Sequence, residues 1–204
     1  MLGAHIGVVD GEFFDKCTAI KKISKKPVVQ IFSSPKLKDS KLNEIKKWLK
    51  DNDIACVIHG SYIINIARDW NDYSPSIIDF IEEIKFAHNI GAFCVVVHLG
   101  KQLELTREQA LNNMYLGLLH VHNSTKQYSD VKILLETPAG QGTEMCSKLE
   151  ELIYFFKKFA HSPISDIKQR FGLCIDTCHI FAAGYDISSP IKVNVYLDTI
   201  EELI

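Results

Sequence analysis

Short runs of β-branched and apolar residues alternate along this chain with amphipathic stretches of about a dozen residues. This alternation is typical of βα units that build a parallel sheet. One run, Val95, Val96 and Val97, is apolar throughout, which indicates a strand covered on both faces. The predicted strands span residues 2–8, 28–33, 55–60, 93–99, 132–136 and 172–177. The predicted helices span residues 13–23, 40–51, 76–89, 107–123 and 148–161.

Signals at three helix ends support these boundaries. Asp39 or Ser40 is expected to cap the second helix, and Thr106 with Gln109 predicts a capping box at the start of the fourth. Gly91 is expected to end the third helix, because glycine readily adopts the left-handed conformation found there.

Six βα units fit two architectures, a doubly wound open sheet or an eight-stranded barrel whose last two units are absent. A dinucleotide-binding open sheet needs a glycine fingerprint after its first strand, and the segment GVVDG at residues 7–11 does not match it. We therefore expect an α/β fold of the TIM-type (β/α)8 barrel, here incomplete with about six units. Residues 1–204 contain no evident linker or repeat, which predicts a single domain.

The composition narrows the class of protein. Hydrophobic residues make up 47% and charged residues 24% of the chain, as in proteins with a sizeable core. A net charge of −2 argues against nucleic-acid binding driven by overall charge, although lysines outnumber acids between residues 16 and 50. The chain has no apolar run near the ~20 residues of a membrane helix, and residues 1–10 lack a secretory pattern. We therefore expect an intracellular protein, in cytoplasm, nucleus or virus, with no membrane partner and with reduced cysteines.

Metal-competent side chains stand where consecutive predicted strands end. In a parallel barrel the active site forms at the carboxyl ends of the strands. His59 ends the third strand, His98 the fourth, Glu136 the fifth, and Asp176 the sixth, with His179 just beyond. Taken singly, each could be a buried histidine bonded to the backbone or a carboxylate that caps a helix. Together they form a mixed nitrogen and oxygen set that suits Zn²⁺ or Mn²⁺, and their number favours a multinuclear site that hydrolyses phosphate esters.

Five segments of the chain resemble the endonuclease IV family of apurinic/apyrimidinic endonucleases. They lie in the same order as in that family and spread over nearly the whole chain. The segments are GAH at 3–5, HGSYIINIA at 59–67, VVHLG at 96–100, LETPAGQGTEM at 135–145 and GLCIDTCHIFAAGYDI at 172–187.

The resemblance implies a TIM barrel with three zinc ions that cuts duplex DNA on the 5′ side of abasic sites, a step of base excision repair. It implies that His59 and His98 hold the first zinc, and that Glu136 bridges it to the second. By the same resemblance Asp176 binds the second zinc and His179 the third. Glu136 is therefore also the candidate catalytic residue.

The resemblance also points to residues that contact DNA. Tyr62 matches a family tyrosine that inserts into the duplex, and Ile63 stands beside it. The alternative for Tyr62 is a half-buried loop aromatic. After the second strand the family commonly places Asn and Arg or Trp, whereas this chain has Lys36 and Lys38, which can reach phosphate but lack the planar fork of arginine. Recognition of the abasic site is therefore expected to be altered.

The family takes its remaining zinc ligands from a seventh and an eighth strand. We expect this 204-residue chain to end before either strand, and therefore to be inactive or to need completion. Two other functions stay open: a metal-dependent sugar isomerase or epimerase of similar architecture, and a non-catalytic truncated barrel. The segment AAGYD and the HGSY loop favour the endonuclease. A monomer is expected.

Overall fold

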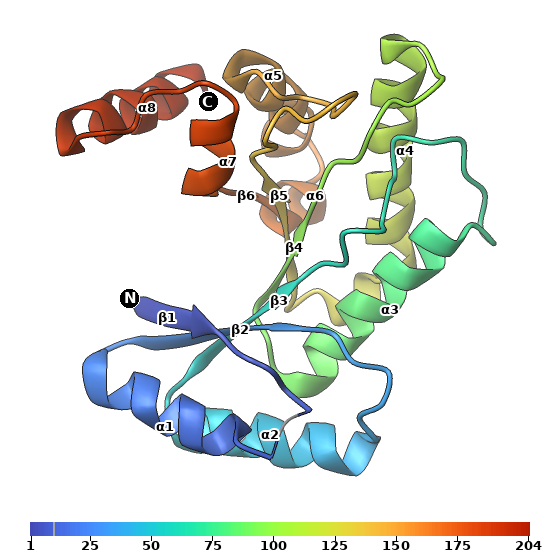
Figure 1. Ribbon diagram of the computed structural model, residues 1–204. Helices are drawn as coiled ribbons and strands as arrows, with labels where there is room; N and C mark the ends of the chain where they lie inside the picture. The colour runs from blue at the N-terminus through green and yellow to red at the C-terminus, as the bar shows by residue number, and fades with distance from the viewer. Residues whose placement is uncertain (10) are drawn as a thin grey trace.

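Six parallel strands form a single sheet in the order β1-β2-β3-β4-β5-β6 in the computed structural model, which describes residues 1–9 and 11–204. Each strand therefore lies beside its predecessor, as in a barrel wall (Figure 1). Within the described residues, β1 and β6 are not paired with each other, so the wall stays open between them. This confirms the predicted incomplete barrel. The strands are β1 Leu2–His5, β2 Pro27–Phe32, β3 Ala55–His59, β4 Cys94–Val97, β5 Lys132–Glu136 and β6 Phe171–Cys174.

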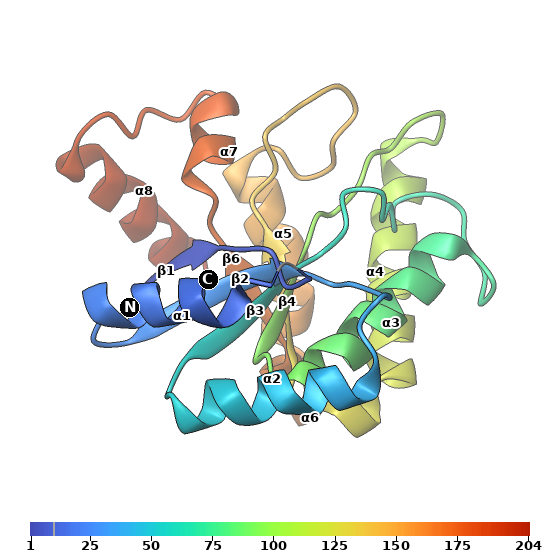
Figure 2. The same cartoon turned by 60° about the horizontal axis from the view of Figure 1, so that its bottom comes forward.

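The helices cover the outer face of this curved sheet (Figures 1 and 2). Helices α1 to α5 follow β1 to β5 in turn, while α7 and α8 follow β6 at the open side. The larger core lies between strands and helices, and a smaller one joins α5, α7 and α8. The helices are α1 Phe13–Ile23, α2 Asp39–Asp51, α3 Pro75–Ile90, α4 Arg107–Ser124, η1 Lys126–Tyr128, α5 Leu149–Ala160, α6 Ser165–Arg170, α7 Thr177–Ala182 and α8 Pro190–Leu203.

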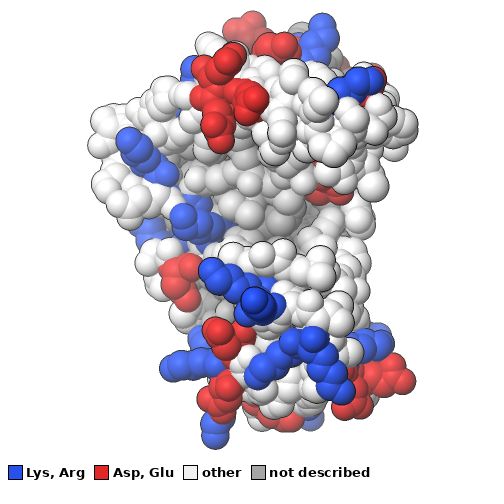
Figure 3. Space-filling view, turned by 90° about the vertical axis from the view of Figure 1, so that its left-hand side faces the viewer, with Lys and Arg blue, Asp and Glu red and all other residues white. Residues whose placement is uncertain are grey.

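Alternating strand residues divide between the two faces of the sheet. Val29 and Ile31 of β2, and Ile58 of β3, belong to the core under the helices. The residues between them, among them Val28 and Val57, point to the barrel interior and are only partly buried. The interior face is therefore the one left accessible by the open side. Figure 3 shows a hollow in this face of the molecule, with Lys and Arg side chains along part of its border.

Several predicted boundaries were wrong. Strand β1 ends at His5 and β6 at Cys174, so Asp176 lies beyond its strand, at the N-cap of α7. Strands β1 and β6 are edge strands, paired on one side only, which favours an early end of the ladder, but the central strand β4 also ends at Val97 and not at the predicted Leu99. Lys38, rather than Asp39 or Ser40, is the N-cap of α2, and its side chain makes no capping bond.

Two predicted helix ends are confirmed. Thr106 and Gln109 form the reciprocal capping box of α4, and Gly91 ends α3 with a positive φ of 79°. Asp10 of the segment GVVDG lies outside the described residues. All six cysteines are free thiols. Among the described residues, no helix has the length and apolarity needed to cross a bilayer.

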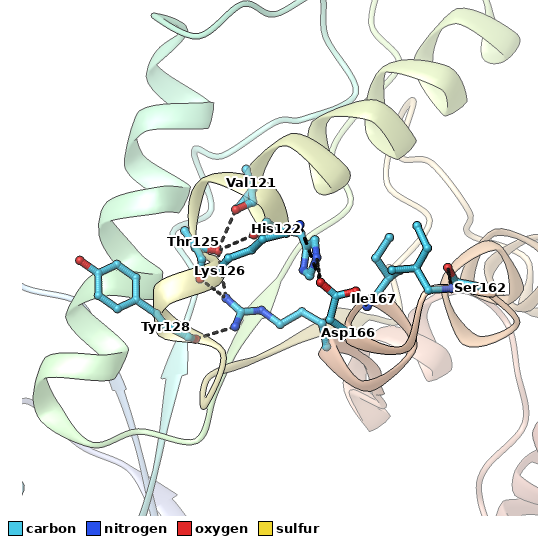
Figure 4. Close-up of polar contacts among 10 residues, drawn as sticks. Val121, His122, Thr125, Lys126, Tyr128, Ser162, Asp166 and Ile167 are labelled. Atoms are coloured by element: carbon cyan, nitrogen blue, oxygen red, sulfur yellow. Dashed lines mark hydrogen bonds and ion pairs between the residues drawn. The ribbon is translucent and has the colours of Figure 1, made fainter.

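The buried Arg170 ties the segment after α4 to the start of β6, and Figure 4 shows the neighbouring Thr125, Tyr128 and Asp166. The guanidinium of Arg170 donates hydrogen bonds to the carbonyl oxygens of Tyr128 and Thr125 and to the Thr125 hydroxyl. These carbonyls lie at the carboxyl end of a helical segment, where a cation is favourable. His122 and Asp166 face each other beside it, with Nε2 and Oδ2 3.4 Å apart. This anchor fixes the start of β6, the strand that leads to Asp176.

Candidate metal centre

The five predicted ligands converge on one region at the carboxyl ends of the strands. His59 is the last residue of β3, His98 directly follows β4, and Glu136 is the last residue of β5. Asp176 caps α7, and His179 lies in its first turn. They form two groups of possible metal ligands, His59 with His98 and Glu136, and Glu136 with Asp176 and His179. Within each group the ligand atoms all lie within 4.8 Å of one another, and Glu136 belongs to both.

The strand register explains why residues so far apart in sequence meet. His59 pairs with Val96 and not with His98, and Glu136 pairs with Cys174 and not with Asp176. His98 and Asp176 are thus displaced by two residues toward the carboxyl end relative to His59 and Glu136, because barrel strands are tilted and staggered, whereas the register of β4 and β5 places His98 level with Glu136. His98 shares the inward direction of Val96, two residues earlier, because side chains along a strand alternate.

Two histidines are held by backbone carbonyl groups. Nδ1 of His59 lies 2.9 Å from the carbonyl oxygen of Gly60, and Nδ1 of His179 lies 2.9 Å from that of Thr137. When Nδ1–H donates to a carbonyl, the lone pair sits on Nε2, which is then free to bind a cation. Burial lowers the pKa of His59, which favours the neutral imidazole that metal binding requires.

Buried polar atoms without partners mark the centre of the site. Nε2 of His98 and Oε2 of Glu136 are 2.9 Å apart, but they lack the alignment of a hydrogen bond. Neither atom, nor Nδ1 of His98, has a hydrogen-bond partner among the described residues. Leaving such a group buried and unpaired costs about 1–3 kcal/mol. A divalent cation would satisfy both the imidazole and the carboxylate, so this residue set fits a metal.

Asp176 connects β6 to α7 at the second ligand group. Its Oδ1 accepts the backbone N–H of His179 at 2.9 Å, and its own N–H donates to the Thr137 hydroxyl at 2.9 Å. The N-cap bond therefore orients the carboxylate and His179 together. Thr137 in turn follows Glu136, which brings the β5 and β6 ends into one unit.

An exposed aromatic and an exposed aliphatic side chain border the ligands. Tyr62 is 67% exposed, and its ring centroid lies 4.7 Å from that of His98 and 5.0 Å from that of His59. Ile63 is 77% exposed. Both side chains line a cavity of about 510 Å³ that also reaches Glu136 and His179. They therefore stand at its mouth, where a large ligand would meet them first.

The predicted lysines lie farther from the ligands. Lys36 and Lys38 are exposed on the segment between β2 and α2. Their neighbours Pro35 and Leu37 line a second cavity of about 730 Å³, which Tyr62 also lines. The segment that contains Lys36 and Lys38 and the side chain of Tyr62 therefore border the same 730 Å³ cavity. Neither lysine belongs to the metal-ligand groups.

Sequence reasoning missed three residues around the centre. Arg68 and Lys101 are exposed cations that line the 510 Å³ cavity. Asn65 joins their two loops, because its Oδ1 accepts the N–H of Lys101 at 3.0 Å and its Nδ2 donates to the Lys101 carbonyl at 3.0 Å. These three residues could have been found from the sequence, because they lie in the loops that follow β3 and β4, at the end of the sheet where the ligands gather.

Comparisons with known proteins identify the family and the fold of the chain. A family model described as xylose isomerase-like TIM barrel matches residues 21–203. "Putative endonuclease 4" of Acanthamoeba polyphaga mimivirus is 35% identical over 184 residues, which cover 86% of this chain and 56% of the relative. The chain thus spans about half the length of the curated relatives it matches.

Solved structures show the same fold. Endonuclease IV from Thermus thermophilus superposes with a TM-score of 0.75 at 24% identity, covering 97% of this chain and 71% of that one. D-psicose 3-epimerase from Clostridium cellulolyticum has a TM-score of 0.69 at 13% identity, covering 96% and 71%. The chain therefore belongs to the xylose isomerase-like TIM barrel family and, within it, to the endonuclease IV proteins.

Proposed function

We propose that this chain carries the metal centre of a zinc-dependent endonuclease that hydrolyses the phosphodiester bond 5′ of abasic sites in duplex DNA. The observation that carries the proposal is the pair of ligand groups joined by Glu136 beside the exposed Tyr62. The relatives named endonuclease 4 support the reaction class.

The two ligand groups divide the proposed work among the residues. His59, His98 and Glu136 would hold one ion, while Glu136, Asp176 and His179 would contribute to the others. The resemblance to endonuclease IV implies three ions in all. Three imidazoles with two carboxylates favour zinc, with Mn²⁺ as the alternative. Ions bound there lower the pKa of a bound water and neutralise the charge that develops on the departing oxygen.

The rim of the cavity suits a nucleic acid. Tyr62 and Ile63 offer an aromatic and an aliphatic face to unstacked bases, and one stacked base contributes about 1–3 kcal/mol. Arg68 and Lys101 stand at the cavity and Lys36 and Lys38 on the neighbouring segment, where they would neutralise phosphates. DNA contact would thus come from several loops that surround the ligands.

The epimerase alternative would also use a metal-ligand set, and the matching family model is described as xylose isomerase-like, but the epimerase structure is 13% identical to this chain and shows the fold alone. A cavity mouth with two exposed apolar side chains and two cations suits a polyanion better than a small sugar.

Incision of DNA tests the proposal. A chimera would join residues 1–204 to the remaining C-terminal part of the mimivirus relative, and the 204-residue chain would be assayed beside it. With zinc, we expect the chimera to nick a duplex that contains a tetrahydrofuran abasic analogue, and not an intact duplex. His98→Ala and a chelator should each abolish nicking. A His98→Ala chimera that still nicks at the parental rate would refute the assignment.

A further inference from the structure

One carboxyl group is buried behind the metal centre without being among its ligands. Glu83 lies in the middle of α3, is 5% exposed, and is flanked along the helix by the buried Phe80, Ile84 and Ala87. Burying a carboxyl group among apolar side chains is unfavourable unless it makes specific hydrogen bonds. The position of Glu83 therefore needs an explanation in terms of its contacts.

A single oxygen of Glu83 holds two loops. Its Oε1 accepts the backbone N–H of Ser61 at 3.0 Å and the hydroxyl of Ser33 at 3.3 Å. Ser33 directly follows β2, and Ser61 lies between His59 and Tyr62. The bonds of Glu83 thus tie α3 to two of the loops that bear the proposed DNA contacts.

The peptide unit between Gly60 and Ser61 links Glu83 to His59. The N–H of this peptide is the one that Glu83 accepts, and its carbonyl oxygen is the one 2.9 Å from Nδ1 of His59. Hydrogen bonds in such a chain polarise one another, so a carboxyl at the N–H end strengthens the carbonyl as an acceptor. A stronger acceptor at Nδ1–H makes Nε2 of His59 a better metal ligand.

The preceding peptide, between His59 and Gly60, is held tightly as well. The N–H of Gly60 donates to the carbonyl of Val96 at 2.7 Å. A Cβ at Gly60 would lie 2.4 Å from that carbonyl oxygen and 3.3 Å from Oε2 of Glu83. Only glycine fits between β4 and Glu83, so the peptide has little freedom to turn.

We propose that Glu83 is a positioning residue, which acts through the Gly60–Ser61 peptide to orient the His59 ring and to aim Tyr62 and Ile63 at the cavity mouth. The role of His59 as a ligand and of Tyr62 as a DNA contact rests on the proposed function. The hydrogen-bond chain itself does not. Partners of metal ligands of this kind typically change metal affinity 10- to 100-fold when they are removed.

Three variants test the proposal. Glu83→Met keeps the length and helix propensity of the side chain but has no comparable acceptor, whereas Glu83→Gln keeps an acceptor oxygen in the same place. Glu82→Gln changes the exposed neighbour and is the matched control. Zn²⁺ affinity would be measured against a chromophoric chelator, and hydrogen exchange would be followed in peptides that cover residues 59–65.

We expect Glu83→Met to bind Zn²⁺ 10- to 100-fold more weakly and to exchange the Ser61 amide faster, with Glu83→Gln and Glu82→Gln close to the parent. With Co²⁺ in place of Zn²⁺, the visible absorption of the bound ion should change in Glu83→Met alone. Parental affinity and exchange in a folded Glu83→Met protein would overturn the inference, as would equal weakening in Glu83→Gln.

Two further comparisons separate a failure of this inference from a failure to fold and from a failure of the proposed function. If Glu83→Met does not fold, an ester in place of the Gly60–Ser61 amide removes the Ser61 donor and weakens the Gly60 carbonyl as an acceptor without altering α3. Weaker Zn²⁺ binding and faster exchange at residues 62–65 are then expected. If the parent chain neither binds Zn²⁺ nor supports DNA incision, the proposed function fails. Exchange at residues 59–65 then still decides whether Glu83 holds the peptide.

Discussion

Glu136 is the residue on which both ligand groups depend. It is 3% exposed, stands 2.9 Å from His98, and belongs to both sets of possible ligands. A buried carboxyl group that makes no hydrogen bond to the neighbouring imidazole is costly, and a shared carboxylate can hold two cations close together. The side chain that is hardest to explain in an apoprotein is thus the one that the proposed metal centre needs most.

Tyr62 gives a prediction at the level of a single side chain. Tyr62→Ala should weaken binding of the chain or the chimera to abasic-analogue DNA by about 1–3 kcal/mol, because stacking with an unstacked base is lost. Thermal stability should change little, since the ring is 67% exposed. Fluorescence anisotropy with a labelled duplex measures the affinity. Tyr73→Ala is the control, because Tyr73 is 86% exposed and lines neither cavity; equal weakening in both variants would count against a specific role.

Glu83 gives a prediction about pH. Burial raises the pKa of Glu83 from 4.5 to about 7. The folded chain therefore binds more protons than the unfolded chain between these values, so this group's contribution to stability is full below pH 4.5 and is lost as pH rises through 7. Glu83→Gln, which cannot ionise, should remove this decline. Urea unfolding of the metal-free protein across that pH range measures it, and an unchanged slope in the variant would show that Glu83 is not the group responsible.

At the scale of elements, each ligand depends on where its strand or helix ends. His59 and Glu136 are the last residues of their strands, while Asp176 gains its orientation by capping α7. The chain thus uses the unpaired polar groups at the ends of β5, β6 and α7 to fix side chains that would otherwise rotate freely. Loops can vary while these ends keep the ligands in place.

The capping box of α4 gives a prediction at this scale. The Thr106 hydroxyl accepts the N–H of Gln109, and Oε1 of Gln109 accepts the N–H of Thr106 at 3.0 Å. Thr106→Ala should therefore lower the free energy of unfolding by about 0.5–2 kcal/mol. Thr199→Ala in the interior of α8 is the control, because alanine is a better helix former than threonine. Urea titrations compare the two, and a neutral Thr106→Ala would contradict the role of the cap.

At the scale of the whole molecule, the open side between β1 and β6 is the dominant feature. All four residues of β1 are exposed, whereas all four of β4 are buried. Amide groups of β1 should therefore exchange with solvent much faster than those of β4, since exposed edge strands open locally. Hydrogen exchange with mass spectrometry measures both segments, and equal protection would mean that another surface covers β1 in solution.

Metal binding should stabilise the molecule as a unit, because the ligands come from β3, β4, β5 and α7. Zinc at a hundred times its dissociation constant should add about 2.7 kcal/mol to the free energy of unfolding. Chelation should reverse this gain, and His98→Ala should greatly reduce it. Thermal unfolding with and without zinc provides the measurement. An equal zinc effect in His98→Ala would place the ion elsewhere.

The pattern of residues determined the number and order of the βα units, because buried parallel strands and amphipathic helices leave different periodicities. It also singled out His59, His98, Glu136, Asp176 and His179, because carboxyl ends of parallel strands share one rim. The sequence missed α6 and α7, which have six residues each, too short to establish a helical period, and it missed α8 at the end of the chain.

Only the tertiary structure decided the rest. The pairing register sets His98 level with Glu136 and displaces Asp176 two residues beyond Cys174, the partner of Glu136, and a pairing register is a long-range property. The link from Glu83 through one peptide to His59 joins a helix to a strand end 24 residues earlier, and no local pattern marks it. Spacing in sequence can predict which residues share a rim, but hydrogen bonds between separate elements exist only once those elements have packed.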